Sequence, residues 1–312
     1  MALKPSIRDL AWMAGGAIVF LLVSLIVLRF HHEPDPAQAL ASRVRKLGLV
    51  DAMRVELASA AEAGRSAVLA STDEESQSLA DQSRAHSTSV DRARQELAGS
   101  FQDAGTESER DRLEQFSKAF ADSRRIDDEL LGLAVKNTNF KALGLAFGPA
   151  AAALTDMTEA LSRLAAARGA SPGSASATQL AYGAEIAALR IQALLAPHIV
   201  EESDPKMDQI EARMAELSGE VERDLAGLRA LPDAAADADL PAAASSWSRF
   251  RELQAQILSL SRENTDVRSL TISLDRSRKV MVACQEALGA LREAVEAEPI
   301  PGVTYGTPVK AR

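Results

Sequence analysis

The stretch Asn137–Leu164 decides the fold, and it reads NTNFKALGLAFGPAAAALTDMTEALSRL. A second stretch, Asn264–Leu291, reads NTDVRSLTISLDRSRKVMVACQEALGAL and begins 127 positions later. In both copies, apolar or small residues alternate at spacings of four and three, the seam along which α-helices pack in bundles and coiled coils. The repeat therefore predicts one helical unit that is used twice. The seam positions are Leu143, Phe147, Ala150, Leu154, Met157, Leu161 and Leu164, then Leu270, Leu274, Ser277, Met281, Cys284, Leu288 and Leu291.

The composition also favours an all-α protein. Aromatic residues make up 4% of the 312 residues and charged residues 25%, with abundant Ala, Glu, Leu and Arg, as in long packed helices. The net charge of −9 argues against a nucleic-acid partner, because such partners are bound by basic surfaces. The single cysteine excludes an intramolecular disulfide. The four histidines show no metal-ligand spacing, and we expect no metal or other cofactor.

A membrane anchor is predicted near the amino terminus. Leu10–Leu28 contains 19 uncharged residues, enough to span a hydrocarbon core of about 30 Å. The alternative is a signal peptide cleaved near Ala37-Gln38-Ala39, but its apolar region would usually be shorter, about 7–15 residues. We therefore expect a short tail over residues 1–9 and an uncleaved transmembrane helix over residues 10–30. Basic residues flank this segment on both sides and leave its orientation open.

Two modules of four helices each are predicted after the anchor. Thr72 with Glu75 and Thr106 with Glu109 are typical of capping boxes at helix starts. Helices of about 30 residues separated by short breaks favour an up-down-up-down bundle. The fold class is therefore all-α, with a transmembrane helix followed by two tandem up-down four-helix-bundle units. We expect the first module over residues 33–168, a linker over 169–177 (GASPGSASA), the second module over 178–298 and a disordered tail over 299–312.

Two runs resemble a known family. Asp127–Ala142 (DDELLGLAVKNTNFKA) and Arg262–Ser269 (RENTDVRS) each resemble the four-helix-bundle sensor domain of methyl-accepting chemotaxis receptors. A tandem of such modules is similar to the bimodular helical sensor domains of some chemoreceptors and histidine kinases. The resemblance covers about residues 33–298 and implies a periplasmic sensor domain. No apolar span follows Leu28 and 14 residues follow Glu298, so we expect the chain to lack the signalling part of such receptors.

Two groups of residues are candidates for ligand binding. At the starts of the two repeats, Asn137, Thr138 and Lys141, with Asn264, Thr265 and Arg268, could hydrogen-bond a carboxylate. Helix capping, or a buried polar residue that fixes helix register, would explain the same residue types. Arg124 and Arg125, matched in part by Arg251, could bind a small organic acid through their guanidinium groups. The alternative for this pair is a salt bridge to Asp127 or Asp128.

Together these patterns predict a protein that binds rather than catalyses, because no Ser-His-Asp context, phosphate loop or HExxH motif occurs. We expect a sensor or binding module in the inner (cytoplasmic) membrane, held by residues 10–30, with most of the chain in the periplasm. Its expected partners are a small anionic metabolite, and a second copy or a partner receptor that contacts the bundle. The alternative is a structural, membrane-tethered helical scaffold or oligomerisation protein.

Overall fold

The computed structural model describes residues 36–168, 174–232 and 238–300, and within these ranges the protein is all-α, with no strand. The predicted transmembrane segment, residues 10–30, lies outside the described residues, as do most of the predicted linker and tail. None of the helices in the described ranges combines the length and the apolar character that a membrane crossing requires. Helix α7 (Ser174–Val200) begins inside the linker predicted over residues 169–177.

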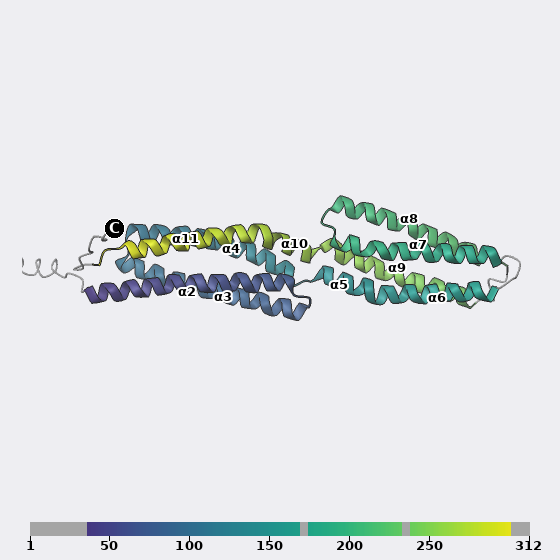
Figure 1. Ribbon diagram of the computed structural model, residues 1–312, viewed down its shortest axis with the longest axis horizontal. Helices are drawn as coiled ribbons and strands as arrows, with labels where there is room; N and C mark the ends of the chain where they lie inside the picture. The colour runs from purple at the N-terminus through teal and green to yellow at the C-terminus, as the bar shows by residue number, and fades with distance from the viewer. Residues whose placement is uncertain (1–35, 169–173, 233–237, 301–312) are drawn as a thin grey trace, which may run out of the picture.

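Two sets of packed helices lie end to end in an elongated molecule (Figure 1). The first set contains α2 (Pro36–Leu69), α3 (Asp73–Ala104), α4 (Glu107–Ala134) and α11 (Arg278–Ala297). The second set contains α6 (Ala151–Arg168), α7 (Ser174–Val200), α8 (Asp204–Arg229) and α9 (Asp239–Glu263). Between them lie α5 (Thr138–Leu145) and α10 (Thr265–Ile272), which continue through the π-helical segments η1 (Ala146–Ala150) and η3 (Ser273–Ser277) into α6 and α11.

This division differs from the tandem modules expected at residues 33–168 and 178–298. α6 packs on α7 and α9, whereas α11 packs on α4 and α2. Phe116 accordingly shares an apolar core with Cys284 and Leu288, and Leu161 shares another with Phe250. The physical reason is that the chain does not reverse after α4 or after α9. It passes straight on into the neighbouring set, so each set receives its fourth helix from the other repeat.

Local capping explains where several helices begin. Thr106 and Glu109 form a complete capping box, in which each side chain bonds the other residue's backbone N–H. At Thr72 one half of the expected box is present, since its hydroxyl accepts a hydrogen bond from the backbone N–H of Glu75. Gly148-Pro149 does not end its helix, because the π-helical turn of η1 accommodates the proline. The capping patterns therefore locate two helix starts that the structure contains.

Two long helical rods run through both sets, one from α4 through α5 to α6 and the other from α9 through α10 to α11. Each rod is interrupted where the two sets meet. Asn137 and Asn264 adopt left-handed backbone conformations (φ 49° and 50°), and they are the only non-glycine residues in the described ranges with positive φ. The backbone N–H of Thr138 donates to Thr265 Oγ1 at 3.2 Å, and that of Thr265 donates to Thr138 Oγ1 at 3.1 Å. The two hydroxyl oxygens lie 3.1 Å apart. Each rod therefore supplies the capping group for the other rod's helix start.

The next residues continue this exchange. The backbone N–H of Asn139 donates to Asp266 Oδ2 at 2.7 Å, and that of Asp266 donates to Asn139 Oδ1 at 3.1 Å. The asparagine side chains tie the rods to the neighbouring loops, since Asn137 Nδ2 donates to Asp73 and Asn264 Nδ2 donates to the carbonyl of Glu201. We call these six residues, 137–139 and 264–266, the junction. Its reciprocal bonds relate the two repeats by an approximate two-fold axis.

Breaking one half of the Thr138–Thr265 exchange should weaken the other. We expect Thr138→Ala and Thr265→Ala each to lower the free energy of unfolding by about 1 kcal/mol, the typical contribution of a helix cap. We expect the double variant to lose clearly less than the sum, because both single variants break the same hydroxyl–hydroxyl bond. Urea unfolding of the full chain measures these values, with the exposed Thr271→Ala as the matched control. Strictly additive losses, or losses no larger than the control's, would contradict the reciprocal cap.

Candidate functional site

Two clefts occupy equivalent places in the two helix sets. One lies between α3 and α4 and has a volume of about 250 Å³, and the other lies between α8 and α9 with about 450 Å³. Arg124 lines the first and Arg251 the second, 127 positions apart, so the repeat carries the arginine as well as the cleft. The α3–α4 cleft is lined by Ser83, Arg84, Ser87, Thr88, Arg124, Asp127, Asp128 and Leu131. Packing explains both openings, because α3 lies mainly on α2 and α8 mainly on α7.

Hydroxyl and guanidinium groups dominate the α3–α4 cleft. Arg84 is held by Asp81 at 2.9 Å, and the Thr88 hydroxyl donates to the Arg84 carbonyl. Arg124 has no hydrogen-bond or ion-pair partner among the described residues, so the expected salt bridge to Asp127 or Asp128 is not formed. Its guanidinium is therefore available to an anion that enters the cleft.

Asp127 forms a polar floor beneath this cleft. The hydroxyls of Ser123 and Ser277 donate to its two carboxylate oxygens at 3.1 and 3.2 Å. Burial raises the pKa of the Asp127 carboxyl above its ordinary value, and the neighbouring Asp128 charge adds to the rise. Burial likewise raises the pKa of the nearby Cys284 thiol to about 12, and this buried cysteine belongs to the apolar core.

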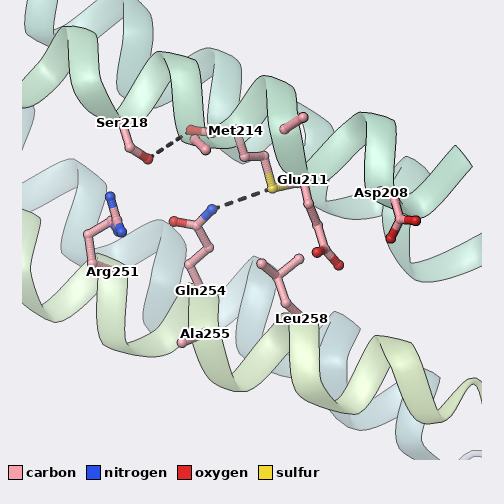
Figure 2. A pocket seen from close by; sticks show the side chains of 10 residues that line it. Asp208, Glu211, Met214, Ser218, Arg251, Gln254, Ala255 and Leu258 are labelled. Atoms are coloured by element: carbon pink, nitrogen blue, oxygen red, sulfur yellow. Dashed lines mark hydrogen bonds between the residues drawn. The ribbon is translucent and has the colours of Figure 1, made fainter. Parts of the chain in front are cut away.

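The α8–α9 cleft has an unsatisfied polar group on its wall. Gln254 is buried and its amide Nε2 donates to the sulfur of Met214 at 3.4 Å (Figure 2). Its Oε1 has no hydrogen-bond partner, although a buried amide oxygen without one is costly. Arg251 lies on the same helix, 3.3 Å from Glu222 and 5.8 Å from the centre of the Trp247 ring. Gln254 Oε1 could accept a hydrogen bond from a ligand in the cleft, and the Arg251 guanidinium could donate one to it.

Acidic residues line the other end of the same cleft. Figure 2 shows Asp208 and Glu211 on α8, away from Arg251 on α9. Arg262 bonds both, at 2.5 Å to Asp208 and 2.7 Å to Glu211, and the buried His198 contacts Glu211 at 2.8 Å. The Arg262 guanidinium lowers the pKa of Glu211 below its ordinary value. The cleft therefore places a positive group and a negative pair at opposite ends.

The junction residues proposed from sequence line neither cleft. Asn137, Thr138, Asn264 and Thr265 are buried. The two threonine hydroxyls accept hydrogen bonds from backbone N–H groups, whereas the side chains of Asn137 and Asn264 make no cap hydrogen bond. The ammonium of Lys141 lies 2.7 Å from Asp73 and lowers the pKa of that carboxyl.

The structure does not bring the arginines proposed from sequence into one site. Arg125 points to solvent and pairs with Asp122 at 3.3 Å, and Arg268 is exposed on α10. Of the eight candidates, Arg124 alone lines either of these two clefts. Sequence reasoning missed Ser87, Thr88 and Gln254, although the unusual polarity of residues 76–90 was a usable signal.

No protein-family model matches this chain, and neither a curated protein nor a solved structure matches it at a significant level.

Removing the buried carboxyl of Asp127 should change how stability depends on pH. Because its folded-state pKa is raised, the folded protein binds this proton more tightly than the unfolded chain, and acidification through the raised pKa adds stability. Asp127→Asn lacks this gain. We therefore expect the stability of the original protein relative to Asp127→Asn to increase as the pH falls from about 7 to about 4.

Urea unfolding of both proteins at each pH measures this difference, with the exposed Asp156→Asn as the control for carboxylates in general. A difference that stays constant over this pH range would show that Asp127 is not buried in the way described.

Proposed function

We propose that this chain is a membrane-anchored, extracytoplasmic binding module for small anionic metabolites, related to the sensor domains of methyl-accepting chemotaxis receptors. It acts by binding and not by catalysis. The observation that carries the proposal is the unpartnered guanidinium of Arg124 in the α3–α4 cleft. Arginine is the side chain best suited to bind a carboxylate through two parallel hydrogen bonds.

The surroundings of Arg124 support a small ligand. At about 250 Å³ the cleft is slightly smaller than the usual ligand pockets of about 300–1,000 Å³, so it suits a small metabolite and not a larger molecule. Ser87 and Thr88 lie on the opposite helix, beside Arg84, which is already paired with Asp81. Asp127 would supply a hydrogen-bond donor to the ligand when it is protonated. Of the two arginines that line this cleft, Arg124 is therefore the one left to bind a carboxylate.

The α8–α9 cleft favours a ligand that carries a carboxylate and a positively charged group. Arg251, which also contacts Glu222, would hold a carboxylate. At the other end the two negative charges of Asp208 and Glu211 exceed the single charge of Arg262 by one and would attract a positive group. The unpartnered Oε1 of Gln254 would accept a hydrogen bond between them. We propose that this second cleft takes an amino-acid-like molecule, whereas the α3–α4 cleft takes an anion.

The arrangement of the chain supports the anchor. α2 begins at Pro36, a few residues after the uncharged run, and its start lies at the same end of the molecule as the end of α11 (Figure 1). That end is secured by a buried ion pair, in which Lys46 Nζ lies 3.0 Å from Glu109 and 3.2 Å from Glu298. A tether at residues 10–30 would place the α3–α4 cleft nearer the membrane and the α8–α9 cleft farther from it.

The alternative function is a membrane-tethered spacer. The elongated shape in Figure 1 favours it, because two end-to-end helix sets hold their far end at a fixed distance. α2 alone, with 34 residues, is about 50 Å long. A spacer needs no ligand, so a direct binding test separates the two functions.

A screen of mono-, di- and tricarboxylates and amino acids by thermal shift tests the proposal on the full chain. We expect at least one carboxylate to raise the melting temperature, since a ligand that binds the folded state stabilises it. Arg124→Gln should weaken that carboxylate about 10- to 100-fold in isothermal titration, the usual effect of losing hydrogen bonds to a charged group. Arg125→Gln, one residue away and exposed, is the matched control and should bind normally.

Equal binding by both variants would remove Arg124 from the site. If no compound in the screen shifts the melting temperature, the spacer becomes the better account.

A further inference from the structure

The outer face of α7 is apolar. Tyr182, Ile186 and Leu189 are 54%, 57% and 47% exposed, and Val200 farther along is 62% exposed. Ala193 is exposed between them. We call these five residues the α7 outer face. The opposite side of the same helix is already buried in the core, through Ala181, Ala184, Ala188, Ile191 and Leu195. A helix with one face in the core normally presents polar residues outward, so α7 has a second apolar face without a partner.

Neighbouring helices do not share this character. The exposed positions of α6 include Asp156, Glu159 and Arg163, which are polar as expected for a solvated surface. On η1, Phe147 is also 66% exposed. η1 is tied to α7 by Gln192, whose Nε2 donates to the carbonyl of Ala146 at 2.7 Å. Exposed apolar side chains thus gather on the outer side of α7, a concentration of apolar surface that typically marks an interaction site.

The spacing of the α7 outer face matches a two-stranded coiled coil. Tyr182 and Leu189 fall on d positions of one heptad register, and Ile186, Ala193 and Val200 fall on its a positions. In that register Glu185 occupies g and Arg190 the following e, five positions later. In a parallel pair of helices, a g residue faces the e residue five positions later on the partner helix. Neither Glu185 nor Arg190 makes an ion pair among the described residues.

We infer that the α7 outer face binds the same face of a second copy of this chain as a short parallel coiled coil. Glu185 of each copy faces Arg190 of the other, so the contact is self-complementary in charge as well as in shape. The parallel direction rests on the proposed membrane anchor, because two copies inserted in one membrane point the same way. The α7 outer face lies outside both clefts, so pairing leaves the proposed ligand sites open.

The contact is small, and its strength follows from its size. From Tyr182 to Val200 the seam is about 27 Å long. A single helix pair of this length buries less surface than a standard protein–protein interface. The dimer therefore depends on concentration, and tethering both copies in a membrane raises their effective concentration.

Cysteine cross-linking of the full chain in its membrane tests this inference. The buried Cys284 is first replaced by Ala, and Ile186→Cys or Leu189→Cys is introduced separately. We expect each single variant to form disulfide-linked dimers under mild oxidation, because a and d residues of a parallel pair meet their own counterparts. Glu159→Cys on α6 and Glu216→Cys on α8 are exposed controls and should stay monomeric.

Charge exchange adds a second criterion. Glu185→Arg and Arg190→Glu should each lower the cross-linking yield about fivefold, since each turns both ion pairs into repulsive contacts. The double variant E185R/R190E should restore the yield. Circular dichroism shows that each variant keeps its helical content. Yields no higher than the controls', or yields insensitive to charge exchange, would overturn the dimer.

The two proposals can fail separately. Cross-links that form only when Ile186→Cys and Leu189→Cys chains are mixed would overturn the parallel pairing and the shared anchor direction. Carboxylate binding by a protein whose cross-linking yield stays at the level of the controls would leave the binding function intact while the dimer is rejected. Cross-links without any carboxylate binding would support the dimer and reject the ligand.

Discussion

The reciprocal hydrogen bonds between Thr138 and Thr265 are the constraint on which the architecture depends. Two long rods break at one residue each, and each break exposes backbone N–H groups that must be satisfied. Because each threonine caps the other rod, the breaks must lie side by side, and the two repeats are held in register. The left-handed Asn137 and Asn264 redirect the backbone by a single residue, so the rods continue and do not fold back.

This constraint explains the repeat and its spacing. The segments 138–145 and 265–272 are both short helices, and each is followed by a π-helical turn at an equivalent position. Each repeat contributes three helices to one set and its fourth to the other. The clefts follow from the same arrangement, since Arg124 and Arg251 lie at equivalent heights on α4 and α9. The two repeats thus form two clefts, each lined by an arginine at the equivalent position but otherwise by different residues.

Much of this fold can be predicted from the sequence, but not the pairing of its helices. Thr72 and Thr106 predict helix starts, because capping depends on residues close in sequence. The apolar seams through Met157 and Cys284 predict packed helices. A seam shows that a helix is buried on one face and not which helix covers it. Asn137 is typical of a helix end, and whether the chain then reverses or continues depends on Thr265, a contact 127 residues away.

The candidate site divides along the same line. Arg124 could be selected from sequence because its chemistry is distinctive, and the capping alternative for the Asn-Thr pairs rested on local chemistry too. The roles of Gln254 and Met214 could not be predicted, because they depend on how far α8 separates from α9. Likewise, the local sequence does not show that Asp127 accepts hydrogen bonds from Ser123 and Ser277 and forms no salt bridge with Arg124.

The most direct measurement is a crystal structure of the protein bound to the carboxylate that stabilises it most. The account predicts that the ligand's carboxylate lies against the Arg124 guanidinium between α3 and α4, with the Thr138–Thr265 exchange intact. A carboxylate bound at the junction, or at a surface away from Arg124, would contradict it.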